Sequence, residues 1–240
     1  MMLKVEDLHV SVAGKEIVNG ISFSLEKGNV YAIMGPNGSG KSSLCNALMG
    51  NPDYISKGKM VMDGKDISSL SADERARRGM FLSFQNPEEI EGVELEGLMR
   101  KASKSSDKKE EIRNWALVKN KVRDAGEKLG LKADGRELNV GFSGGEKKKA
   151  EIVQMEILQP KLVLLDEIDS GLDVDALKAV AKAINKMRNG ERTFLIVTHY
   201  SRILKHVKPD FVLIMKDGRI VKTDGPALVK TIEKEGYTAI

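Results

Sequence analysis

The segment GPNGSGKS, residues 35–42, constrains the fold of this 240-residue chain more than any other stretch. It follows the continuous apolar run Val30–Met34, which is typical of a strand buried on both faces, and it precedes a predicted helix that ends at Gly50. A glycine-rich loop in this context matches the pattern G-x-x-x-x-G-K-[ST], whose backbone N–H groups wrap a phosphate. The alternative is a flexible turn that happens to end in Lys-Ser. Such a turn would not need a buried strand before it and a helix after it. The segment therefore predicts an α/β domain with a phosphate-binding loop.

Strands alternate with helices along most of the chain. Alternating apolar residues around a turn at residues 14–15 predict antiparallel strands in the first thirty residues. The dipeptides Asp63-Gly64 and Asp217-Gly218 each predict a hairpin. Apolar runs at residues 81–84, 162–165 and 194–197 predict further buried strands, separated by predicted helices. This alternation predicts a mostly parallel sheet core with an N-terminal antiparallel β portion.

One region differs from this pattern. Residues 88–138 are charged and contain no clear strand, and apolar residues recur there at helical spacing: Ile112, Trp115, Val118, Val122, Ala125 and Leu129. We predict a helical lobe over residues 88–159, inserted into a catalytic core formed by residues 1–87 and 160–240. The Lys and Glu runs of the lobe are typical of a solvated face.

Composition narrows the class of protein. The chain is 41% hydrophobic and 31% charged, as globular proteins are, and its net charge of +4 is too small to argue for direct contact with nucleic acid. The single cysteine, Cys45, excludes an internal disulfide and cannot alone hold an iron–sulfur cluster. The N-terminus lacks a signal-peptide core, and no stretch reaches the roughly 18–20 apolar residues of a membrane span. We therefore expect a cytoplasmic protein without direct membrane insertion.

Polar side chains stand at the ends of three apolar strands. Asp166 and Glu167 follow one run, His199 follows another, and Gln85 follows a third. The carboxyl ends of parallel strands meet at one edge of a sheet, where α/β sites lie. We predict that Asp166 holds Mg²⁺ through water and that Glu167 orients or deprotonates a water that attacks a γ-phosphate. His199 and Gln85 could contact the same groups, or each could be bonded only locally.

Two motifs supply further candidate phosphate ligands. In the glycine-rich loop, Lys41 would reach the β- and γ-phosphates and the Ser42 hydroxyl would bind Mg²⁺. In GFSGGE, residues 141–146, Ser143 and Glu146 have the spacing of a capping box at the start of a helix. A capped helix N-terminus flanked by glycines can also bind an anion, and the residues alone do not say whose phosphate that would be.

These motifs, in this order, resemble those of the ABC ATPases over essentially the whole chain. FSGGE is similar to the family signature, Gln85 to the Q-loop residue, Asp173 to the D-loop aspartate and His199 to the switch histidine. The resemblance implies a P-loop NTPase fold of ABC ATPase type and hydrolysis of ATP to ADP and phosphate. It also implies a transient, ATP-dependent head-to-tail homodimer with two ATP molecules between the subunits.

The resemblance assigns roles to particular positions. The catalytic residues would be Glu167, His199 and Gln85, and Mg²⁺ would be held by Ser42, Gln85 and Asp166. Ser143, Gly144 and Gly145 of one subunit would face the γ-phosphate held by Lys41 of the other. The full set of implied nucleotide-binding residues is Gly35, Pro36, Asn37, Gly38, Ser39, Gly40, Lys41, Ser42, Ser43, Ser143, Gly144, Gly145 and Asp173.

Within the family, the chain resembles the ATPases of the SUF iron–sulfur cluster assembly system. Importer ATPases usually carry other residues where this chain has Phe142, Glu146 and Gly171. The implied partners are the scaffold proteins SufB and, in systems that have it, SufD, whose conformation ATP would change. The alternative is the nucleotide-binding subunit of a membrane ABC transporter, which shares every catalytic motif. A DNA-repair or chromosome ATPase head ranks lower, because such heads carry long coiled-coil insertions and this chain has no sustained heptads.

Two expectations concern contacts. Family members couple to their partners between Gln85 and the signature, which predicts a partner surface at residues 87–93, a mixture of charged and apolar side chains. Many members stack adenine on an aromatic residue in the first hairpin, where this chain has Val12. Ring stacking is then unavailable at that position, and the sequence leaves open what contacts the base.

Overall fold

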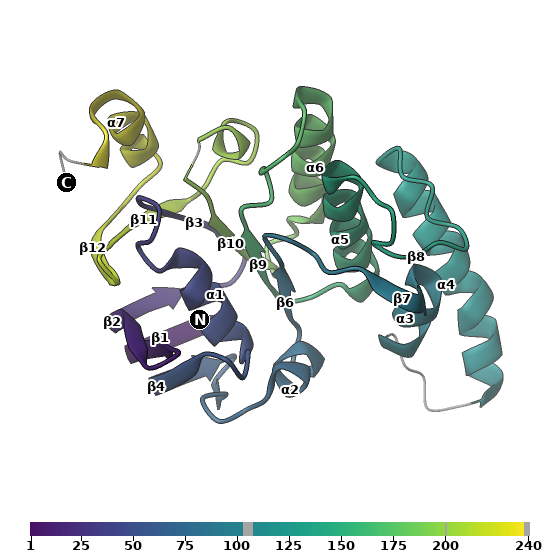
Figure 1. Ribbon diagram of the computed structural model, residues 1–240, viewed down its shortest axis with the longest axis horizontal. Helices are drawn as coiled ribbons and strands as arrows, with labels where there is room; N and C mark the ends of the chain where they lie inside the picture. The colour runs from purple at the N-terminus through teal and green to yellow at the C-terminus, as the bar shows by residue number, and fades with distance from the viewer. Residues whose placement is uncertain (103–107, 200, 238–240) are drawn as a thin grey trace. The chain divides into compact units, whose positions relative to one another are not determined.

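The computed structural model describes residues 1–102, 108–199 and 201–237, with the side chains of residues 108–115 outside the described part (Figure 1). The chain divides into two compact units. The first comprises Met1–Gln85, Pro160–Asp169 and Arg188–Ile240, and the second comprises Asn86–Gln159 and Ser170–Met187. Residues 170–187, expected in the core, thus group with the second unit.

A six-stranded sheet forms the centre of the first unit, in the strand order β12-β11-β3-β10-β9-β6. Its strands from β11 to β6 are parallel, and β12 pairs antiparallel with β11. Every residue of β3, β9 and β10 is buried, as the continuous apolar runs predict. The bounds are β3 Val30–Met34, β6 Met80–Ser83, β9 Leu162–Asp166, β10 Thr193–Val197, β11 Phe211–Lys216 and β12 Arg219–Asp224.

A four-stranded sheet, in the order β2-β1-β4-β5, confirms the predicted antiparallel portion. Its strands are β1 Leu3–Val12, β2 Lys15–Leu25, β4 Ile55–Met62 and β5 Lys65–Asp66. The hydrophobic core of the unit contains side chains from this sheet, from α1 (Lys41–Met49) and from the larger sheet. Because α1 follows the glycine-rich loop directly, packing of α1 into this core fixes one end of the loop. The unit also contains α2 Ala72–Arg77, the 3₁₀ turn Ile203–Lys205 and α7 Ala227–Glu235.

The second unit is mainly helical, as predicted for the lobe. Its helices are α3 Leu95–Ala102, α4 Lys108–Lys128, α5 Gly144–Leu158 and α6 Val174–Met187. Val118, Val122 and Ala125 of α4 are buried, and so is Leu129 just after it, which confirms that part of the apolar face. The side chains of Ile112 and Trp115 lie outside the described residues. Among the described residues, α5 contacts both α4 and α6.

The expectation that residues 88–138 contain no strand is wrong. β7 (Ile90–Glu94) and β8 (Glu137–Leu138) form a two-stranded antiparallel sheet in which Ile90 pairs with Leu138. β7 has no buried residue and carries two charged residues with a glycine, so it lacks the alternation that marks a strand. Its pairing depends on residues more than forty positions away, which a local pattern does not reveal.

Candidate functional site

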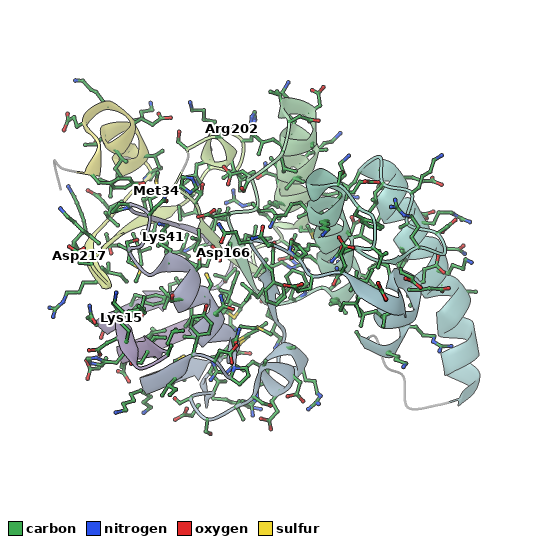
Figure 2. The ribbon with its side chains drawn as sticks, in the orientation of Figure 1. Lys15, Met34, Lys41, Asp166, Arg202 and Asp217 are labelled. Atoms are coloured by element: carbon green, nitrogen blue, oxygen red, sulfur yellow. The ribbon has the colours of Figure 1, made fainter. Side chains whose placement is uncertain are left out.

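The glycine-rich loop joins the end of β3 to the start of α1. Gly38 and Gly40 adopt φ angles of 78° and 99°, which favour glycine, and α1 begins at Lys41. Lys41, labelled in Figure 2, is 5% exposed, and its Nζ donates back to the loop at the carbonyl oxygens of Gly35 and Pro36, at 2.9 Å each. Burial lowers the pKa of Lys41, and the nearby carboxylates of Glu167 and Asp166 act in the opposite direction.

A hydroxyl and a carboxylate meet beside the loop. The Oγ of Ser42, on the first turn of α1, donates to Oδ1 of Asp166 at 3.1 Å. Asp166 is the last residue of β9, which is separated from β3 in the sheet only by β10. The strand-end carboxylate and the loop hydroxyl, far apart in sequence, are therefore neighbours, and both offer oxygen atoms to a hard cation.

Glu167 is the point where three predicted residues come together. Its Oε2 accepts a hydrogen bond from Gln85 Nε2 at 2.7 Å, and its Oε1 lies 3.2 Å from His199 Nδ1. Its backbone has a positive φ of 48°, and its N–H donates to the Val197 carbonyl at 2.9 Å. Gln85 and His199 therefore share Glu167 as a partner, and they are not bonded only to groups within their own strand ends.

A pocket of about 600 Å³ is lined by residues of the phosphate loop together with Gln85, Glu167 and His199. Most of its lining was predicted from the sequence, but Lys15 and Ile17 of β2 were not. The register of the first hairpin explains their position, because Lys15 is the cross-strand partner of Val12. Val12 itself does not line the pocket. The lining residues are Lys15, Ile17, Asn37, Gly38, Gly40, Lys41, Ser42, Ser43, Gln85, Glu167 and His199.

The sequence did not predict a buried contact made by the residue next to His199. Thr198, which precedes His199, donates from Oγ1 to Oδ1 of Asp169 at 3.2 Å. Both side chains are buried, and burial raises the pKa of Asp169. This bond ties the end of β10 to the loop after β9. Only a strand order that makes β9 and β10 neighbours could have revealed it.

The predicted signature residues belong to the second unit. Ser143 is the N-cap of α5, and its Oγ accepts from the Glu146 N–H at 3.3 Å while the Ser143 N–H donates to Glu146 Oε2 at 2.9 Å. These bonds form the predicted capping box, and together with Arg136, 3.0 Å away, they lower the pKa of Glu146. Ser143 and Gly144 are exposed and Gly145 is half-buried. At the start of α6, Asp173 accepts from the Ala176 N–H at 2.7 Å.

Comparisons with known proteins identify relatives of this chain. A family model described as ABC transporter matches residues 18–170. The chain is 46% identical over 241 residues to the probable ATP-dependent transporter SufC of Escherichia coli K12, covering 98% of this chain and 97% of that protein. It is 46% identical over 240 residues to vegetative protein 296 of Bacillus subtilis 168 (98% and 91% covered). A probable ABC transporter ATP-binding protein of Streptococcus pyogenes serotype M18 is 49% identical over 245 residues (100% and 94% covered).

Solved structures share the fold. A nucleotide-free ATP-binding cassette from an ABC transporter matches with a TM-score of 0.76 at 24% identity, covering 98% of this chain and 95% of that one. A dimeric cassette in a post-hydrolysis state, bound to ADP and Pi, matches with a TM-score of 0.76 at 19% identity, covering 94% and 99%.

The chain therefore belongs to the ABC transporter family and is an ATP-binding cassette ATPase. Within that class it is a full-length homologue of SufC. Across the described part of the chain, no helix combines the length and the apolar character needed to cross a membrane.

Proposed function

We propose that this chain is a cytoplasmic ATPase subunit that binds MgATP, hydrolyses it, and drives conformational change in a SUF-type iron–sulfur cluster assembly scaffold. The observation that carries the ATP-dependent part is the pocket in which the phosphate loop meets Gln85, Glu167 and His199. The full-length similarity to SufC supports the assembly role. SufB, with SufD-like proteins where a system has them, are the partners that we propose.

The loop and its surroundings suit a nucleotide with its metal. Successive N–H groups at the start of α1 and the ammonium of Lys41 provide positive charge for the β- and γ-phosphates. The Ser42 hydroxyl and the Asp166 carboxylate are oxygen ligands of the kind Mg²⁺ takes, so the residues present fit the ion, and Gln85 adds an amide oxygen. When bound, Mg²⁺ neutralises charge on the phosphate oxygens.

Hydrolysis would depend on residues that meet at Glu167. We propose that the Glu167 carboxylate orients or deprotonates the attacking water, and that His199 positions this water and the γ-phosphate. Gln85 and His199 already bind the two oxygens of the Glu167 carboxylate, so the three side chains form one connected set. Loss of any of the three is expected to lower kcat more than nucleotide affinity.

We further propose that the second half of each site comes from another subunit. Ser143, Gly144 and Gly145 stand at the exposed N-terminus of α5, where backbone N–H groups and the helix dipole favour an anion. Asp173 stands at the start of α6 in the same unit. In a head-to-tail homodimer these residues would face the γ-phosphate bound by the phosphate loop of the second subunit.

The base would lie against β2. Lys15 and Ile17 line the pocket together with the phosphate loop, and no aromatic residue is among the lining residues. We propose that the adenine packs on the Ile17 side chain and the aliphatic part of Lys15. Such contacts are apolar and carry no hydrogen-bond pattern, so selection for adenine over guanine should be weak.

The partner surface that we propose is centred on β7 of the second unit. Ile90 of β7 is 43% exposed, and Glu91 and Gly92 are exposed beside it. Glu89, just before the strand, pairs with Lys147 at 2.9 Å, which leaves the apolar side chain of Ile90 flanked by charge. Exchange of Glu89 and Glu91 for lysine together with Ile90→Ala should abolish scaffold binding and spare MgATP binding.

One experiment separates the assembly role from the transport alternative. The chain is purified anaerobically from its own host, and the proteins that accompany it are identified. A soluble partner that carries an iron–sulfur cluster supports the proposal, whereas a polytopic membrane protein means that this is a transporter's ATPase.

Lys41→Met tests the nucleotide site, because it keeps the length of the side chain and removes its charge. We expect calorimetry to detect no MgATP binding to this variant while thermal melting shows it folded.

A further inference from the structure

The turn between β11 and β12 lies against the phosphate loop. The N–H of Gly218, at the tip of this hairpin, donates to the carbonyl oxygen of Ser39 at 3.1 Å. The carbonyl of Gly218 accepts from the Asn19 N–H at 2.9 Å, and Asn19 Nδ2 donates to the Asp217 carbonyl at 3.0 Å. A continuous series of hydrogen bonds thus runs from β2, through the turn, to the middle of the phosphate loop. Figure 2 marks Asp217 at this turn.

Close backbone approach accompanies these bonds. A Cβ added at Gly218 would lie 2.3 Å from the carbonyl oxygen of Ile17 and 2.6 Å from Nδ2 of Asn19. A Cβ added at Gly35, the first residue of the loop, would lie 2.0 Å from the carbonyl oxygen of Met215 in β11. Real Cβ atoms are not found at such distances. Glycine at position 35 therefore lets the loop approach β11, and glycine at position 218 lets the hairpin turn approach β2.

The opposite side of the loop is open. A Cβ added at Gly38 would meet nothing within 4 Å, and Gly38 lines the pocket. The loop therefore has one side held by the β11–β12 hairpin and one side facing the pocket. Neither Asn19 nor the hairpin residues Asp217 and Gly218 line that pocket, so none of them would touch the nucleotide.

We propose that Asn19 and the Asp217-Gly218 turn are positioning residues for nucleotide binding. They act through the carbonyl of Ser39, which they hold so that the following N–H groups of the loop point into the pocket before a phosphate arrives. Preset donors bind an anion without the cost of ordering the loop. This inference rests on the proposed nucleotide site.

We call Asn19 and the Asp217-Gly218 turn together the brace. The chain contains a matched control for each of these two parts. Asp63-Gly64, between β4 and β5, repeats the dipeptide Asp-Gly with φ angles of 49° and 76°, against 49° and 73° at Asp217-Gly218. A Cβ at Gly64 would meet nothing within 4 Å, so alanine there has the same backbone strain without the collision. Ser22, also on β2, accepts a bond from the Asp7 N–H at 2.9 Å, which makes it the counterpart of Asn19 away from the loop.

The test measures MgADP binding to the full chain by calorimetry. Gly218→Ala and Asn19→Ala should raise the Kd about threefold to tenfold, the range that corresponds to one hydrogen bond, whereas Gly64→Ala and Ser22→Ala should change it less than about twofold. The binding stoichiometry separates a misplaced loop from a partly unfolded protein. Partial unfolding lowers the number of binding sites and leaves the Kd of the remaining sites unchanged, whereas a misplaced loop raises the Kd at full stoichiometry. Thermal melting is recorded for each variant.

A raised Kd with full stoichiometry in Gly218→Ala or Asn19→Ala, and not in the controls, supports the brace. If Gly218→Ala does not fold, the comparison of Asn19→Ala with Ser22→Ala decides. A Kd within twofold of the wild type in the folded variants overturns the inference. If the wild type binds no MgADP, or if Lys41→Met binds it as tightly as the wild type does, the proposed nucleotide site itself fails.

Discussion

Single residues near the phosphate loop take their chemistry from burial. Lys41 is almost enclosed, and its ammonium is satisfied by loop carbonyls within the protein. Cys45, one turn further along α1, is fully buried in the core, and burial raises the pKa of its thiol well above the ordinary value of 9.0. A buried, protonated thiol is neither a nucleophile nor a metal ligand, which agrees with the expectation from its being the only cysteine.

Cys45 should therefore resist alkylation in the folded protein. Iodoacetamide at neutral pH should modify less than about a tenth of the native chain in the time that it modifies all of the urea-unfolded chain, because only the thiolate of an accessible cysteine reacts. Mass spectrometry of the intact protein measures both fractions. Rapid labelling of the native protein would mean that the thiol is exposed by frequent opening of α1.

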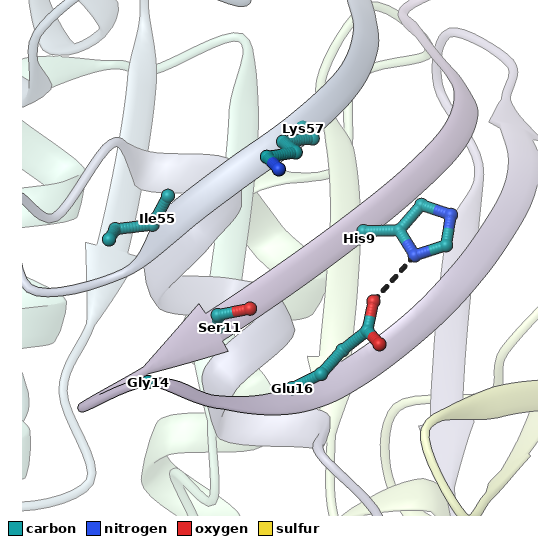
Figure 3. A pocket seen from close by; sticks show the side chains of 6 residues that line it. All are labelled: His9, Ser11, Gly14, Glu16, Ile55 and Lys57. Carbon is teal, nitrogen blue, oxygen red and sulfur yellow. Dashed lines mark hydrogen bonds and ion pairs between the residues drawn. The ribbon is translucent and has the colours of Figure 1, made fainter.

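His9 should titrate above its ordinary value. Its Nδ1 lies 2.6 Å from Glu16, and its Nε2 lies 3.3 Å from Asp7, in a surface pocket that Lys57 also lines (Figure 3). The hydrogen bond to Glu16 is the main reason that the pKa of His9 is raised above 6.5, with Asp7 contributing in the same direction. A raised pKa in the folded state means that this contribution to stability is complete below the unfolded pKa and is lost as pH rises through the folded one.

An NMR titration of the His9 ring measures this pKa directly. Glu16→Gln should shift the midpoint downward, because it removes the nearest negative charge. In urea unfolding, His9→Gln should lower stability more at about pH 5.5 than at about pH 8.5. A midpoint unchanged by Glu16→Gln would contradict the assigned cause.

At the scale of elements, α1 depends on an arginine from α2. Arg75 is 2% exposed, and its guanidinium donates to the carbonyl oxygens of Ala47 and Leu48 in the last turn of α1, at 2.8 Å each. It also donates to Leu70 and Ser68 at 2.9 and 3.0 Å. Its Nη1 also lies 3.9 Å from the Met60 sulfur. Its positive charge thus lies at the negative end of the dipole of the helix that begins at the phosphate loop.

Arg75→Lys should lower the free energy of unfolding by about 2–4 kcal/mol, because an ammonium cannot reach four carbonyls arranged for a planar fork. Arg77 is the matched control on the same helix. Its side chain is 71% exposed and forms a surface ion pair with Asp73 on the same helix, so Arg77→Lys should cost less than about 0.5 kcal/mol. Urea unfolding of the two variants gives the comparison, and equal losses would refute the role of Arg75.

The oligomeric state of the ATP-bound protein tests whether a second subunit completes each nucleotide site. Glu167→Gln should retain ATP binding, stop hydrolysis and accumulate the head-to-tail dimer, because the state before hydrolysis can no longer decay. Sedimentation in saturating MgATP measures the mass. The double variant Glu167→Gln with Ser143→Arg should remain monomeric, because a bulky side chain would fill the space for the second subunit's γ-phosphate. A monomeric Glu167→Gln protein in saturating MgATP would count against the proposed dimer.

The fold was predicted well wherever a signal is local. The buried strands β3, β9 and β10 follow from apolar runs, both Asp-Gly hairpins form at the expected residues, and Ser143 and Glu146 form their capping box. The pair β7–β8 was missed because its strands are polar and distant in sequence. The place of α6 in the second unit likewise depends on contacts that no periodicity specifies.

The sequence by itself determined the strand–loop–helix of the phosphate loop and the polar residues at strand ends, because these depend on residues within a few positions of one another. The roles of the candidate site residues stay predictions. The tertiary structure alone decided that Gln85 and His199 share Glu167, that Lys15 and Ile17 line the pocket, and that the turn at Gly218 supports Ser39. The physical reason is that strand order and register set these distances, and both arise from packing of the whole core rather than from any local pattern.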